Sequence, residues 1–168
     1  MADLAPEERL QPSLLDRLTD DEREKSEESR EQRVLSAAQL RAGVLRDLAW
    51  LLNTGRLSDV EDLSHTPEAE HSVINFGVPD LTGGSSLGLD RGEIERSIRQ
   101  AIIDFEPRII PASVQVRLVV REEEATARAV TIEISGDLWN EPMPEHLFLK
   151  TEIDLQTGEA SLGEGGAR

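Results

Sequence analysis

The sequence contains no cysteine and no tyrosine, and aromatic residues make up only 3% of it. Without cysteine the chain forms neither disulfides nor thiolate metal sites. The scarcity of aromatic side chains argues against stacking platforms for bases or sugars. No apolar run approaches the roughly 20 residues that a membrane-spanning helix requires. These absences disfavour disulfide-stabilised, carbohydrate-binding and integral-membrane proteins.

Positive charge is also scarce, because 18 lysines and arginines face 34 aspartates and glutamates, which gives a net charge of -16. Affinity for nucleic acid or for an anionic membrane depends on clustered basic residues. The first ten residues, MADLAPEERL, are acidic and lack the apolar region of a secretory signal. We therefore expect a soluble, cytoplasmic protein that binds neither nucleic acid nor membranes.

The chain divides by composition into an arm, a domain and a tail, and its length suits one domain. Residues 1–33 form a charged N-terminal arm that we expect to be partly flexible, because residues 19–33 are almost wholly polar and cannot bury a core. Residues 34–155 carry the periodic patterns of a folded domain. Residues 156–168 are glycine-rich and polar, which predicts a disordered C-terminal tail.

Three leucines within the arm, Leu14, Leu15 and Leu18, have helical spacing. This spacing predicts a short amphipathic turn. The turn either packs locally or docks on a partner protein, and the residues leave both roles open.

Two segments carry the apolar periodicity of amphipathic helices, residues 34–52 and residues 90–105. Asp90 is placed to cap the second helix at its N-terminus. Glu95 and Arg99 lie one turn apart on that helix and predict an ion pair on its outer face. Such helices need a packing partner to be stable, either a sheet or another helix.

Three further segments alternate apolar and polar residues, namely residues 113–121, 129–135 and 147–155. This is the period of half-buried antiparallel strands, with one face on the core and one face in water. Together with the helices they predict an α+β fold, in which two main helices pack on one face of a small antiparallel sheet.

The charged residues on the solvent-facing side of this sheet predict the register of its strands. If Leu118 lies opposite Ile132, then Arg117 lies opposite Glu133, and Lys150 flanks Glu133 on the other side. Opposite charges on neighbouring strands favour that alignment by roughly 0.2–1 kcal/mol per pair.

The connection over residues 136–146 carries two large apolar side chains, Trp139 and Met143, between prolines and acidic residues. Exposed, these side chains would be anchors for a partner. Buried, they would close the end of the sheet, which is the arrangement we expect.

Motifs for catalysis or metal binding are weak. His65, Glu68, Glu70 and His71 are the only cluster of metal-ligand types, and their spacing does not match HExxH. Acidic residues are plentiful, but nothing marks two of them as a catalytic pair. We expect no catalytic residue, no metal, no cofactor and no small-molecule substrate.

The most unusual local sequence is FEPRI at residues 105–109, where the second helix gives way to the sheet. Pro107 cannot continue a helix and pushes Glu106 toward an extended conformation. A carboxylate here opposes the helix macrodipole, whereas Arg108 complements it. Two interpretations stay open: a solvated ion pair at a helix stop, or a fixed charge pair that orders the junction or meets a partner. The adjacent arginine favours the ionised carboxylate, which makes Glu106 a poor general acid.

Four segments in order carry a family resemblance: PSLLDRL at residues 12–18, LRDLAWLLNT at 45–54, SVINFGVPDLTG at 72–83 and IRQAIIDFEPRI at 98–109. The chain resembles the TssE baseplate subunits of bacterial type VI secretion systems over about residues 12–155. That family is similar to a phage baseplate wedge protein once labelled a gene 25-like lysozyme.

The resemblance implies a non-enzymatic role in a cytoplasmic baseplate, with other wedge subunits and sheath subunits as partners. We expect strands within residues 113–155 to start sheath polymerisation by strand addition. The family's EPR motif falls on Glu106, Pro107 and Arg108, which would orient the sheet or contact a partner. The three leucines of the arm would dock on wedge subunits. Two alternatives remain at this point: a lysozyme-like peptidoglycan hydrolase, and a tail component of a phage-derived contractile particle.

Overall fold

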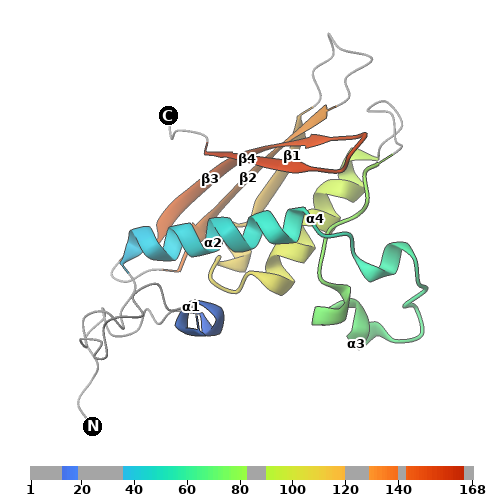
Figure 1. Cartoon of the computed structure of the whole chain (residues 1–168), viewed down its shortest axis with the longest axis horizontal. Coiled ribbons are helices and arrows are strands. Elements are labelled where there is room, and N and C mark those ends of the chain that lie inside the picture. Colours follow the sequence, from blue (N-terminus) through green and yellow to red (C-terminus); the bar gives the residue numbers. More distant parts are fainter. Residues whose placement is uncertain (1–12, 19–35, 83–89, 120–128, 140–142, 165–168) are drawn as a thin grey trace.

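The computed structural model describes residues 13–18, 36–82, 90–119, 129–139 and 143–164 (Figure 1). Its helices are α1 (Leu14–Leu18), α2 (Ala37–Leu52), α3 (Pro67–Glu70) and α4 (Arg91–Phe105), with three short 3-10 turns, η3 (Leu57–Asp59), η4 (Val73–Asn75) and η5 (Pro111–Ser113). Its strands are β1 (Gln115–Val119), β2 (Ala129–Leu138), β3 (Glu145–Asp154) and β4 (Ala160–Glu164).

The four strands form one sheet in the order β1-β2-β3-β4, and every neighbouring pair is antiparallel. Helices α2 and α4 cover the same face of this sheet (Figure 1). The predicted α+β class, with two main helices on an antiparallel sheet, is confirmed. The predicted register is confirmed as well, because Leu118 pairs with Ile132 and Glu133 lies between Arg117 and Lys150.

The core forms where the inward residues of the strands meet the apolar stripes of α2 and α4. The buried strand residues alternate with exposed or half-buried ones, as expected of a sheet with one face on the core and one face in solvent. The fully buried side chains include Val44, Leu48, Ile98, Ile102, Ile132, Ile134, Leu147 and Leu149. One polar side chain lies among them: Thr151 is fully buried, and its Oγ1 has no hydrogen-bond partner.

Each main helix begins at a side-chain cap. Asp90 accepts a hydrogen bond from the Glu93 main chain at 3.1 Å, as predicted. Ser36 and Gln39 form a complete capping box at the start of α2. Because Ser36 supplies this cap, α2 begins at Ala37 and not at residue 34.

The structure corrects two further boundaries. The stretch predicted as a disordered tail contains β4, so that prediction is wrong over residues 156–164. Gly158, with a φ of 75°, allows the tight return from β3, after which buried Ala160 and exposed Ser161 resume the alternation. The expected connection over residues 136–146 is also shorter, because β2 continues to Leu138 and β3 begins at Glu145. Most of the arm, at residues 1–12 and 19–33, lies outside the described residues.

Candidate functional site

The junction after α4 is a buried corner. Helix α4 ends at Phe105, and the Glu106 main-chain N–H still donates to the Ile102 carbonyl at 2.9 Å. Pro107 then turns the chain away, which brings the Glu106 side chain inward, where it is only 3% exposed. A buried carboxylate is stable only with partners, so its environment decides what it does.

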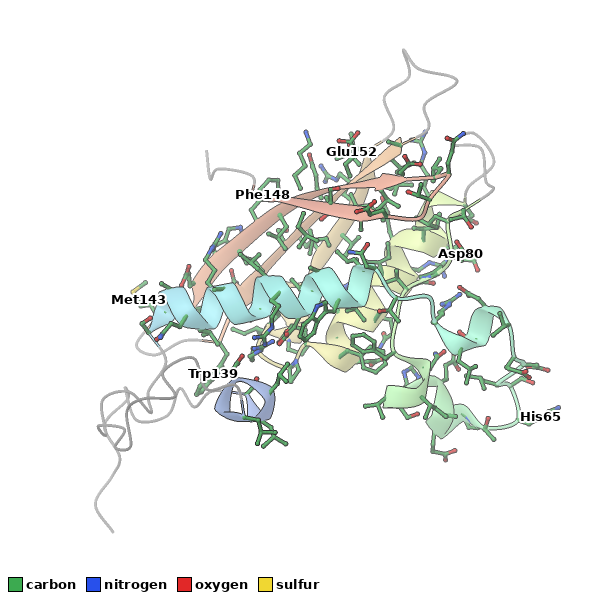
Figure 2. The ribbon with its side chains drawn as sticks, in the orientation of Figure 1. His65, Asp80, Trp139, Met143, Phe148 and Glu152 are labelled. Carbon is green, nitrogen blue, oxygen red and sulfur yellow. The ribbon has the colours of Figure 1, made fainter. Side chains whose placement is uncertain are left out.

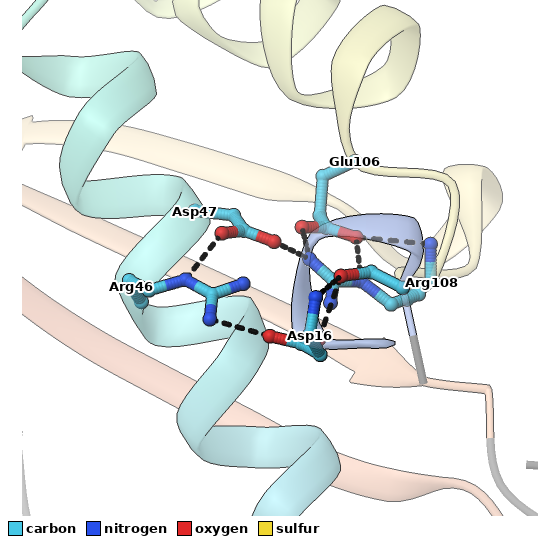
Figure 3. Close-up of polar contacts among 6 residues, drawn as sticks. Asp16, Arg46, Asp47, Glu106 and Arg108 are labelled. Atoms are coloured by element: carbon cyan, nitrogen blue, oxygen red, sulfur yellow. Dashed lines mark hydrogen bonds and ion pairs between the residues drawn. The ribbon is translucent and has the colours of Figure 1, made fainter. Parts of the chain in front are cut away.

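Arg108 supplies those partners (Figure 3). Its Nε donates to one carboxylate oxygen of Glu106 at 2.7 Å and its Nη2 to the other at 2.5 Å, the fork geometry that arginine favours. The Arg108 main-chain N–H adds a bond to Oε1 at 3.1 Å. The interpretation as a solvated pair is therefore wrong, and Glu106 and Arg108 form a fixed pair inside the chain.

The pair continues into α2 and α1 (Figure 3). Arg108 Nη2 also donates to Asp47 at 2.5 Å, and Asp47 accepts from Arg46 Nε at 2.8 Å. Arg46 Nη1 in turn reaches Asp16 of α1 at 2.5 Å. One chain of alternating charges thus fastens α1, α2 and the end of α4 together. We call these five residues, Glu106, Arg108, Asp47, Arg46 and Asp16, the corner network.

The surroundings of three members of the network, Asp16, Arg46 and Arg108, favour their charged forms. The hydrogen bond from Arg46 is the largest influence on Asp16 and lowers the pKa of its carboxyl group. Hydrogen bonds to Asp47 and then Asp16 raise the pKa of Arg46. Burial acts against the charge of Arg108, but its bonds to Glu106 and Asp47 outweigh burial and raise its pKa. Each of these three groups is therefore held in its ionised form.

Sequence reasoning found Glu106 and Arg108 but missed the α2 and α1 members. The available signal was a charged pair, Arg46 and Asp47, inside the apolar segment LRDLAWLL. Gly43 was a second signal: a Cβ there would lie 3.3 Å from Arg108 Nη1 and 3.8 Å from Asp16 Oδ2. The missing side chain lets α1 and Arg108 approach the same turn of α2.

Apolar side chains are exposed around the corner network. Leu14 and Leu18 are 71% and 74% exposed, so α1 is held by Asp16 while these leucines face solvent. Trp139 is 46% and Met143 74% exposed, so the expected burial of these two side chains is wrong. The Trp139 main chain donates to the Arg108 carbonyl at 2.7 Å, which leaves its ring outside the core next to the corner (Figure 2).

The two edges of the sheet differ. In antiparallel strands, alternate residues direct their main-chain groups toward the neighbouring strand or away from it. Glu95 accepts the outward N–H of Leu118 on β1 at 2.8 Å, and Arg99 donates to the carbonyl of Val114, just before β1, at 3.0 Å. Glu95 and Arg99 therefore hold α4 along this edge. The ion pair predicted between them does not form in the described structure.

On β4 only the first residue is capped in this way. Asn53, just after α2, accepts the N–H of Ala160 at 2.9 Å and donates to its carbonyl at 3.0 Å. By the same alternation the main-chain N–H and carbonyl of Leu162 point away from β3. Among the described residues no side chain bonds to these two groups. Among the described residues the edge of β4 is therefore open from Leu162 to Glu164, which lies outside residues 113–155, where we expected the strands that accept the sheath.

The histidine and glutamate cluster at residues 65–71 was the other candidate site. His71 binds Asp104 at 2.8 Å, and no group of three or more histidine, aspartate or glutamate side chains in the described ranges is arranged to hold a metal ion. Across the same residues, no helix has the length and apolarity needed to cross a membrane.

Comparison with known proteins supplies the family. No curated protein and no solved structure matches the chain. The family described as baseplate wedge protein gp25 matches residues 38–143, which is more than half of the sequence and includes α2, α4, the EPR residues and β2. The role of that family in a phage-type baseplate is structural. The chain belongs to the baseplate wedge protein gp25 family, the one that includes the TssE subunits.

Proposed function

We propose that this protein is a non-enzymatic baseplate subunit of a type VI secretion system, located in the cytoplasm, which joins wedge subunits and starts the contractile sheath. The observation that carries the sheath role is the difference between the sheet edges. On the β1 side, α4 binds the Leu118 N–H and the carbonyl of Val114 just before the strand, whereas no side chain of the described residues caps β4 from Leu162. An open antiparallel edge accepts a strand from another protein through main-chain hydrogen bonds.

The wedge role is supported by the surface around the corner network. Leu14, Leu15 and Leu18 of α1 and the neighbouring Trp139 present apolar area to solvent, and clusters of this kind supply the anchors of protein interfaces. Glu106, Pro107 and Arg108 act in this proposal by holding that surface in place. The Glu106 carboxylate is fully engaged by Arg108, which favours a structural role for it over that of a catalytic acid.

The sheath role is tested by removing one hydrogen-bond donor. Leu162→Pro deletes an outward N–H without touching the ladder to β3, a position where an edge strand tolerates proline. Leu162→Ala keeps the N–H and is the matched control. We expect co-expressed sheath subunits to purify with wild type and Leu162→Ala but not with a folded Leu162→Pro. Sheath binding by all three proteins would contradict strand addition at β4.

The wedge role is tested by Leu14→Ser combined with Leu18→Ser. Val60→Ser combined with Val73→Ser is the control, because those side chains are equally exposed but lie in the segment between α2 and α4. We expect only the α1 variant to lose co-purification with wedge subunits. Equal retention by both variants would remove the docking role of α1. Release of peptidoglycan fragments by wild type, abolished by Glu106→Gln, would instead establish a hydrolase.

A further inference from the structure

Asn53 connects the end of α2 to the beginning of β4. Its Nδ2 donates to the Ala49 carbonyl of α2 at 2.8 Å and to the Ala160 carbonyl at 3.0 Å, while its Oδ1 accepts the Ala160 N–H at 2.9 Å. Ala160 is itself buried, so water does not compete freely for these groups.

Toward Ala160 the side-chain amide of Asn53 presents one N–H donor and one oxygen acceptor, while its other N–H is bonded to Ala49. These are the groups that a residue of a neighbouring antiparallel strand would offer to Ala160. Asn53 thus takes the place of one residue of a fifth strand, at the end of β4 that follows the β3–β4 turn. A strand that arrives at this edge finds Ala160 already bonded and Leu162 free.

We propose that Asn53 is a register stop for the added strand, which pairs with β4 from Leu162 onward and not at Ala160. A one-residue slip would turn every side chain of the incoming strand to the other face of the sheet, so a fixed end has a direct effect on alignment. This role rests on strand addition to β4, the function proposed above. Asn53 is a positioning residue in this arrangement and sets where pairing begins.

The test measures amide hydrogen exchange by NMR, first in the free protein. We expect the Ala160 amide to exchange slowly and the Leu162 amide to exchange rapidly. In Asn53→Ala the Ala160 amide should exchange about fivefold to tenfold faster, which is the effect of losing one ordinary hydrogen bond.

Thr54→Ala is the matched control for damage to the end of α2. Thr54 Oγ1 donates to the Trp50 carbonyl at 2.7 Å, so this variant loses a bond at the same helix end without touching β4. We expect Ala160 to exchange in Thr54→Ala as it does in wild type. A loss of Ala160 protection in Thr54→Ala would show that a general loosening of the helix end, and not the Asn53 amide, controls this edge.

A second experiment repeats the exchange measurement with the sheath subunit added to each protein. In wild type the sheath should protect Leu162, and in Asn53→Ala it should protect Ala160 as well, because pairing extends by two residues, to the next residue whose main chain faces outward. Protection of Leu162 without any gain at Ala160 in Asn53→Ala would overturn the register stop but leave strand addition standing. If the sheath protects Leu162 in none of the proteins, strand addition fails and the register role fails with it, whatever the free-protein exchange shows.

Discussion

Two ion pairs lie two residues apart at the end of α4, at Asp104 and at Glu106. They differ in burial and in the number of their hydrogen-bond partners. Glu106 is almost fully buried and takes three hydrogen bonds from Arg108, which also binds Asp47. Asp104 binds His71, an exposed ring that is charged only when protonated. The first pair joins α4 to α2 and α1, whereas the second ties the segment after α3 to the helix.

Burial and the number of partners therefore matter more to an ion pair than the presence of opposite charges. Exposed pairs contribute about 0–1 kcal/mol, because solvent and salt weaken them. Removing one member of a buried pair costs roughly 3–5 kcal/mol, because the remaining charge stays desolvated without compensation. The buried pair is the one whose residues form the EPR motif, and its network reaches the surface proposed for partners.

Arg108→Ala should have the largest effect. It removes the two guanidinium hydrogen bonds of the buried Glu106 carboxylate, and we therefore expect the free energy of unfolding to fall by about 3 kcal/mol. Urea denaturation followed by circular dichroism measures this. Arg117→Ala, on the wet face of the sheet, is the control and should stay within about 0.5 kcal/mol of wild type. A loss below about 1 kcal/mol for Arg108→Ala would show that the corner tolerates the unpaired Glu106 carboxylate. The buried pair would then be worth no more than an exposed one.

Thr151→Val tests a buried polar group that has no partner. Thr151 is as buried as Glu106, but its hydroxyl has no partner. Valine keeps the branched shape and removes the unsatisfied group, so we expect a gain of about 1 kcal/mol in the free energy of unfolding. The same urea experiment measures it. Thr131→Val, at a half-buried position on β2, is the control. A loss of stability in Thr151→Val would mean that the hydroxyl is satisfied in solution.

The sequence predicted what depends on local pattern. The α+β class, the cap at Asp90 and the pairing of Arg117 with Glu133 follow from periodicity and charge alternation, and the structure has them. The EPR corner was found because proline and opposed charges are local signals. Its partners were not found, because Asp16 and Arg46 are 30 residues apart and only the fold brings them together.

The misses have physical reasons as well. The tail prediction misses β4 because the strand is short and the glycines in and around it conceal the alternation, and its pairing with β3 is what makes it a strand. The expected burial of Trp139, which would close the end of the sheet, is also wrong. Its main chain is fixed by Arg108 at the end of β2, which leaves the ring outside. The β1 contacts of Glu95 and Arg99 were missed because helical spacing alone says nothing of a neighbouring strand edge.

Asp16→Asn should have a small effect on global stability, about 0.5 kcal/mol, because Arg46 and Asp16 are both partly exposed. Its local effect should be larger, since α1 is only five residues long and depends on this contact. We expect faster limited proteolysis within residues 13–18, with the rest of the chain equally resistant. Asp62→Asn, in an exposed loop, is the control. Unchanged cleavage in Asp16→Asn would show that other contacts hold α1.

His71→Ala should have the smallest effect, and its pH dependence identifies it. The hydrogen bond to Asp104, followed by the charges of Asp104 and Glu70, raises the pKa of His71 above its ordinary value of 6.5. A raised pKa means that the stabilisation is complete below pH 6.5 and is lost as the pH rises through the folded-state value. Wild type should therefore exceed His71→Ala in stability at pH 5.5, and the difference should vanish at alkaline pH. Thermal unfolding across this range measures it, with His65→Ala as the exposed control. A difference that grew with pH would mean that neutral His71, and not its charged form, makes the important contact with Asp104.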